Sequence, residues 1–215
     1  MPRESASDVQ IEIAATAARL IAEDGLDYAT AKRKAVEAIT GDGVRGLMPD
    51  NALVESELRR WLAAFGGERH RERLRAMRTL ALQLMQRLDG YAPHLVGAVL
   101  NGTATEHSDI RLQLFTDSAK DVEIFLLNEG VDFEVFEDDA ANGAAEEVLQ
   151  FVIQPARTRG TPARVGVVLA IHGHDAIRTA PRGVSNEPEL HPVEASGRAT
   201  RAQLLRLLAE TETPE

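Results

Sequence analysis

The sequence predicts an α+β protein, and two observations lead to this prediction. Apolar residues recur every three to four positions through the stretches that precede residue 89, as they do on one face of an amphipathic helix. From residue 94 onward the apolar residues alternate with polar ones, which is the pattern of half-buried β-strands. We therefore expect an N-terminal helical module, followed by a small mixed β-sheet with flanking helices.

The helical stretches have clear ends. Gly25 and Gly41 follow the last apolar positions of the first two helices, as glycine does at helix C-termini. Asp50 is placed to cap the third helix, and Gly66 follows its last apolar residue. The helices expected from these signals cover residues 8–24, 28–40, 51–65 and 68–88.

The second part of the chain predicts strands with one helix between them. Ser118 is placed to cap that helix, which runs to Asn128. A segment rich in proline and glycine begins at residue 179, and four leucines in the last helix, expected over residues 200–209, need a surface to pack against. The expected strands cover residues 95–100, 109–115, 131–137, 148–154 and 165–171. The expected domains are residues 1–66, 67–178 and 179–215.

Composition excludes several classes of protein. The chain has no cysteine, which excludes disulfides, thiolate zinc sites and cysteine nucleophiles. No run of about 18 apolar residues occurs and the first residues are polar, so we expect a cytoplasmic protein without a membrane partner. Of the net charge of −10, residues 94–155 contribute two basic residues against thirteen acidic ones. Such an acidic segment argues against DNA binding.

The most informative stretch runs from Gly97 to Leu112 and reads GAVLNGTATEHSDIRL. Gly97, in a glycine turn, is followed twelve residues later by Asp109, which lies in Ser108-Asp109-Ile110 at the start of an alternating strand. This spacing resembles the signature of the polymerase-beta-type nucleotidyltransferases, in which a Gly-Ser turn precedes Asp-hydrophobic-Asp. The resemblance covers about residues 70–155 and implies a sheet of nucleotidyltransferase type.

The chain as a whole also resembles a group of proteobacterial proteins that are sometimes labelled muramate–alanine ligases. That label implies a Gly-x-x-Gly-Lys-Thr phosphate loop, which this sequence lacks. We therefore do not adopt that activity.

The resemblance implies a set of catalytic and nucleotide-binding residues. Two acids at i and i+2 of a strand project from one face and can hold Mg²⁺ against a nucleoside triphosphate. Asp109 is the expected metal ligand and catalytic residue, and Asp132 or Glu134 would supply a further carboxylate from a neighbouring strand, with Glu134 favoured. The nucleotide-binding candidates are Gly97, Ala98, Gly102, Thr103, Ser108 and Arg111.

Two positions depart from the family pattern. Ala98 stands where the family has serine, and Arg111 stands where it has the second carboxylate. A guanidinium stays protonated and repels Mg²⁺, but it can bind a phosphate directly. It can also pair with Asp109 or Glu134 as a structural ion pair.

The sequence therefore leaves three functions open. The first, which we favour, is a nucleotidyltransferase-like protein that binds a nucleotide or phosphate with weak or lost metal-dependent transfer. The second is a helical interaction module that binds a protein partner through residues 1–66 and uses the sheet as a scaffold. The third is an active Mg²⁺-dependent nucleotidyltransferase.

Overall fold

The computed structural model describes residues 7–41, 47–136, 145, 147–181 and 183–211. The chain divides into two compact units, one formed by Met1–Arg71 with Thr105–His107 and the other by Glu72–Ala104 with Ser108–Glu215. The predicted boundary at residue 66 falls a few residues before this division, and residues 179–215 belong to the second unit. Within the described ranges, no helix is long and apolar enough to cross a membrane.

The first unit contains three helices with side-chain caps at their N-termini. Ser7 and Gln10 form a capping box, Asp27 accepts from the Thr30 amide at 2.9 Å, and Asp50 accepts from the Leu53 amide at 2.7 Å. These bonds satisfy N–H groups that have no partner inside a helix. The helices are α1 (Asp8–Asp24), α2 (Tyr28–Thr40) and α3 (Asn51–Phe65).

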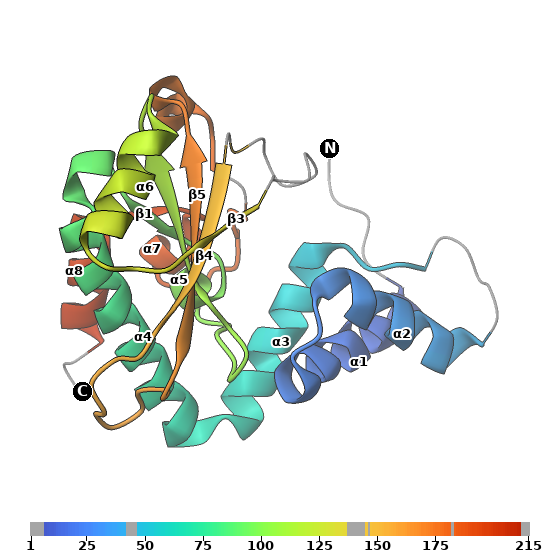
Figure 1. Cartoon of the computed structure of the whole chain (residues 1–215). Helices are drawn as coiled ribbons and strands as arrows, with labels where there is room; N and C mark the ends of the chain where they lie inside the picture. Colours follow the sequence, from blue (N-terminus) through green and yellow to red (C-terminus); the bar gives the residue numbers. More distant parts are fainter. Residues whose placement is uncertain (1–6, 42–46, 137–144, 146, 182, 212–215) are drawn as a thin grey trace. The chain divides into compact units, whose positions relative to one another are not determined.

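The second unit is built on a mixed sheet (Figure 1). Its described strands form one six-stranded sheet in the order β3-β4-β5-β2-β1-β6. Strand β2 runs parallel to β5, and the other neighbouring strands are antiparallel. The strands are β1 (His94–Val96), β2 (Ile110–Phe115), β3 (Glu134–Phe136), β4 (Glu147–Ile153), β5 (Val165–His172) and β6 (Ala199–Thr200).

One face of this sheet is covered by helices, as Figure 1 shows. Leu112 and Leu169 point to that face and are buried together with Met85, Leu126 and Leu204 from three helices. The alternating pattern of the strands places the polar positions on the opposite face. The covering helices are α4 (Gly67–Arg87), α6 (Ala119–Asn128) and α8 (Arg201–Glu210).

The expected strand over residues 95–100 is wrong in its second half. β1 ends at Val96, and residues 98–101 form the short helix α5 (Ala98–Asn101). Gly97 has φ +71° and ψ −154°, a conformation that a residue with a side chain rarely adopts and that ends the strand. The apolar run from Val96 to Leu100 fits a buried strand and a buried helical turn equally well, so periodicity could not separate them.

The third strand is shorter than the alternation predicts. β3 contains only residues 134–136, so Asp132 precedes the strand, while residue 137 lies outside the described residues. Of the two candidate carboxylates, only Glu134 therefore lies on the strand. The strand has a partner on one side only, because β3 forms an edge of the sheet. The expected strands over residues 131–137 and 148–154 leave a connecting loop between them, and residues 137–144 and 146 of that region lie outside the described residues.

The segment rich in proline and glycine is held to the second unit by Arg198. Its guanidinium donates to the Ile177 carbonyl at 2.7 Å and lies over the Phe115 ring, 5.1 Å from the ring centre. The 3-10 helix η3 (His174–Arg178) precedes this segment, and the segment contains the helix α7 (Pro192–Ala195). A further 3-10 turn, η1 (Asp89–Tyr91), precedes β1. Of the four leucines in α8, Leu205 is exposed and the other three are buried.

Candidate functional site

The face of the sheet that α4, α6 and α8 do not cover is called the open face here. It carries one row of side chains across four strands. Glu134 on β3 pairs with Gln150 on β4, Gln150 pairs with Val168 on β5, and Val168 pairs with Arg111 on β2. Residues in direct register across neighbouring strands point to the same face. Glu134, which the sequence favoured, and Arg111 are therefore on one face, about 14 Å apart along the row at the usual strand spacing.

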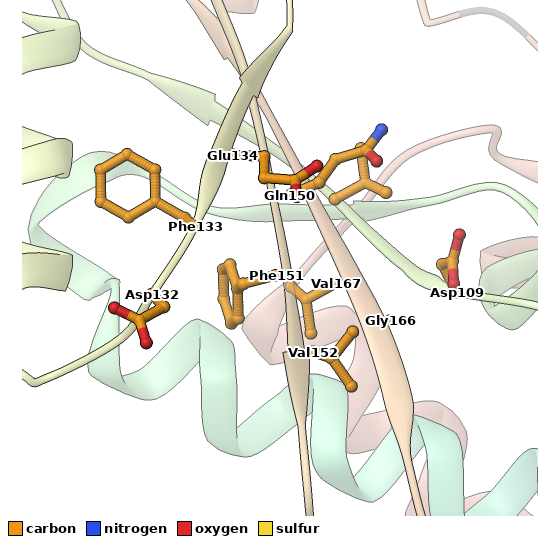
Figure 2. Close-up of a pocket in the computed structure, with 10 residues that line it drawn as sticks. Asp109, Asp132, Phe133, Glu134, Gln150, Phe151, Val152, Gly166 and Val167 are labelled. Atoms are coloured by element: carbon orange, nitrogen blue, oxygen red, sulfur yellow. The ribbon is translucent and has the colours of Figure 1, made fainter.

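A hollow of about 380 Å³ lies over part of this row. Its size falls within the range of about 300–1,000 Å³ that is typical of small-molecule sites. Figure 2 shows Glu134 and Gln150 pointing to the same side of the strands, with Asp109 farther along on that side. The hollow is lined by Asp109, Asp132, Phe133, Glu134, Gln150, Phe151, Val152, Gly166, Val167 and Val168.

Asp109 lies against the backbone of Gly166. A Cβ atom added to Gly166 would lie 2.8 Å from the Asp109 Cγ and would overlap its Oδ1. Asp109 is half-buried, and Gly166 occupies the position on β5 next to the start of β2. The absence of a side chain at Gly166 thus leaves the space that the Asp109 carboxylate fills.

Arg111 lies against Gly97, toward the β1 side of β2 and on the same face of the sheet as Asp109. The Arg111 Cδ is 3.6 Å from the position of a Cβ on Gly97, and the Arg111 side chain is exposed. Within the described part of the chain, Arg111 forms no ion pair, so the structural pairing with Asp109 or Glu134 that the sequence left open is not formed there. The only other basic residue of the acidic segment, Lys120, pairs with Glu123 at 2.5 Å. Arg111 therefore presents the one unneutralised cation among the described residues of that segment.

Asp132 does not join the other acids. In Figure 2 its side chain points away from Glu134 and from Asp109, although all three line the same hollow. No group of three histidine, cysteine, aspartate or glutamate side chains among the described residues could hold a metal ion.

The strand order gives a second reason why metal ligands do not converge. The strand next to β2 on this side is β5, not β3, and β5 places Gly166 and Val168 beside Asp109 and Arg111. Neither of those residues can ligate a cation through its side chain. Glu134 is separated from β2 by two strands, so it is not the neighbouring-strand carboxylate that the sequence suggested. The described residues do not fit a two-metal centre.

Gly102 and Thr103 belong to a buried structural cluster rather than to the hollow. Gly102 ends α5 with φ +85°, and a Cβ there would meet Glu194 Oε1 at 3.4 Å. Thr103 is buried, and its hydroxyl donates to Asn101 Oδ1 at 2.7 Å. Neither residue lines the hollow.

Arg78 is the centre of that cluster. Its side chain is 4% exposed and forms an ion pair of 2.6 Å with Glu194. It also donates to the carbonyls of Val99 at 3.0 Å and Leu100 at 2.8 Å, which α5 leaves unpaired at its C-terminus. This buried arginine fixes α4, α5 and α7 together.

Ala98 and Ser108 lie beside the site without lining the hollow. Ala98 is the first residue of α5 and packs against the core, and Ser108 directly precedes Asp109. The sequence reasoning missed Gln150, Gly166 and Val168. Gln150 carried a signal, because it is the polar residue in the middle of an otherwise apolar strand.

Comparison of the chain with protein-family models, with curated proteins and with solved structures found no match.

Proposed function

We propose that this protein is a nucleotidyltransferase-like protein that binds a nucleotide through the open face of its sheet, without two-metal transfer chemistry. The observation that carries the proposal is the placement of Arg111. Its charge is unneutralised within the described residues, it lies at Gly97, and it shares a sheet face with Glu134 and Gln150, which line the hollow.

The hollow and Arg111 would recognise different parts of a nucleotide. The hollow is lined by acids and an amide, which accept hydrogen bonds from the donor groups of a base or a ribose. A triphosphate would be repelled there by Asp109 and Glu134. Arg111 is the group that can bind the phosphates, because a guanidinium forms two parallel hydrogen bonds to phosphate oxygens. A nucleotide would therefore lie along the row with its phosphates at Arg111.

The absence of a three-ligand metal group among the described residues supports binding rather than transfer. Nucleotidyl transfer requires cations that neutralise charge on the phosphorus oxygens as it develops. An arginine can neutralise the charge of bound phosphates, but it cannot activate an attacking oxygen by coordination.

Isothermal titration of the protein with ATP, CTP, GTP and UTP, each with and without Mg²⁺, tests this proposal. We expect binding that does not require Mg²⁺ and that falls at least about tenfold in Arg111→Ala, the loss of one charge-assisted bidentate contact. Arg206→Ala is the matched control, because Arg206 is an exposed arginine on α8. Absence of binding to every nucleotide would refute the proposal, and release of pyrophosphate would indicate an active transferase instead.

A further inference from the structure

The hollow places a carboxylate and an amide side by side at the far end of the row from Arg111. Glu134 and Gln150 are direct cross-strand partners, and Figure 2 shows both side chains directed to the same side. Both side chains are exposed, so both are accessible to a ligand. Beside them, Val152 is 52% exposed and provides an apolar surface next to the polar pair, while Val168 is buried.

Such a pair distinguishes the bases by their hydrogen-bonding edges. A carboxylate only accepts hydrogen bonds, while an amide both donates and accepts. Guanine presents two adjacent donors, N1–H and the 2-amino group, next to the O6 acceptor. Adenine presents one donor beside the N1 lone pair, which would face a carboxylate oxygen without a proton between them.

We infer that the hollow prefers a guanine base, with the Glu134 carboxylate accepting from N1–H and the 2-amino group and the Gln150 amide donating to O6. This inference rests on the proposed function and names the class of nucleotide. One flat face of the base lies beside the exposed side chain of Val152, where apolar contact replaces water. The phosphates then extend toward Arg111, whose backbone is two strand spacings, about 10 Å, from that of Gln150.

The charge distribution agrees with this orientation. The hollow contains three acids and no basic residue among those that line it, so it favours the end of a nucleotide that carries N–H donors. The opposite orientation would place the phosphates against Glu134 and Asp109. Glu134 thus acts as a specificity-determining residue, and Arg111 contributes equally to all four nucleotides.

The experiment measures the affinities of GTP, ITP, ATP, CTP and UTP by competitive titration. We expect GTP to bind about tenfold or more tightly than the other four, since a bidentate base contact discriminates by roughly that factor or more. ITP is the sharpest probe, because it differs from GTP only in lacking the 2-amino group. Equal affinities for GTP and ITP, or tighter binding of ATP or CTP, would overturn the guanine assignment.

Two variants test whether Glu134 is the residue that causes the preference for guanine. Glu134→Gln removes the acceptor-only group and is expected to abolish the difference between GTP and ITP while keeping sensitivity to Arg111→Ala. Glu12→Gln is the matched control, because it makes the same glutamate-to-glutamine change at an exposed position of α1 that does not line the hollow. Circular dichroism establishes that both variants are folded. If the nucleotides bind alike and all depend on Arg111, the proposed function stands and only the guanine assignment fails. Absence of any binding contradicts both.

Discussion

The Asp109 carboxylate occupies space that exists only because residue 166 is a glycine. The two residues lie on adjacent, parallel strands, and any side chain at Gly166 would overlap Asp109 Oδ1. The backbone of Gly166 does not have the positive φ that would by itself require glycine. The constraint is therefore one of packing, and it can be tested apart from any assumption about function.

Gly166→Ala should destabilise the protein by about 1–3 kcal/mol, the usual cost of forcing extra volume into a filled site. Adding Asp109→Ala removes the group that the new methyl meets, so the double variant should lose less than the sum of the single variants. Urea unfolding of the four proteins measures this coupling. Gly90→Ala is the control, because a Cβ at Gly90 meets no atom within 4 Å. Additive free energies would show that the two residues do not compete for space.

Arg78→Met should destabilise the protein by about 3–5 kcal/mol, because it leaves Glu194 and two carbonyls without their buried donor. Arg87→Met is the matched control. Arg87 pairs with Glu129 but its side chain is 63% exposed, so its replacement should cost less than about 1 kcal/mol. Thermal and urea unfolding measure both. Similar losses for the two variants would contradict the role of Arg78 as the centre of a buried cluster.

The helices were predictable because their signals are local. The first two have the predicted bounds, residues 8–24 and 28–40, and Asp50 and Ser118 cap the helices that follow them. A cap depends on a residue and the amide three positions later, so it can be identified within a few residues of sequence. Strand lengths were less predictable, since tertiary contacts decide where pairing ends.

The candidate site was only partly predictable, because local sequence patterns do not determine the order of the strands in the sheet. Asp109, Arg111 and Glu134 share a sheet face as alternation within strands suggests. β2 lies next to β5 rather than next to β3. This order depends on pairing between segments that are distant in the sequence, and the periodicity of a segment does not predict its partner. The same limit concealed Gly166, whose role depends entirely on the strand it adjoins.

Glu147→Gln should change how stability depends on pH. Burial raises the pKa of Glu147, and the neighbouring Glu123 raises it further through a hydrogen bond and its charge. An acid whose pKa is raised by folding contributes stability below its ordinary pKa of 4.5, and this contribution is lost as the pH rises through the folded-state pKa. The uncharged variant should therefore gain stability relative to the wild type on going from about pH 4 to about pH 7.

Glu123→Gln should show the opposite sign. A hydrogen bond from Lys120 lowers the pKa of Glu123, so this residue contributes stability above its ordinary pKa, and the contribution is lost as the pH falls through the folded-state pKa. Urea unfolding at several pH values compares the two variants. Parallel pH profiles for both would contradict the assigned causes.

Arg111→Asp should create a cation site that the wild type lacks. Residues 109 and 111 are two positions apart at the start of β2, so the substitution would place a second carboxylate on the face of the sheet that carries Arg111. Carboxylates are the ligands that Mg²⁺ and Mn²⁺ prefer, and removal of the guanidinium also removes its repulsion. Titration with Mn²⁺, followed by electron paramagnetic resonance, should detect binding to the variant and none to the wild type.

The control separates coordination from a general increase in negative charge. The double variant Arg111→Asp/Asp109→Asn has the new carboxylate at position 111 but no carboxylate at position 109. It therefore lacks the pair of acids and should bind Mn²⁺ no better than the wild type. Arg111→Asn removes the repulsion without adding a ligand and should also fail to bind. If Arg111→Asn binds Mn²⁺ as well as Arg111→Asp does, repulsion by the guanidinium alone prevents metal binding. If neither binds, the missing acids on β5 are decisive, because Gly166 and Val168 offer no further ligand beside β2.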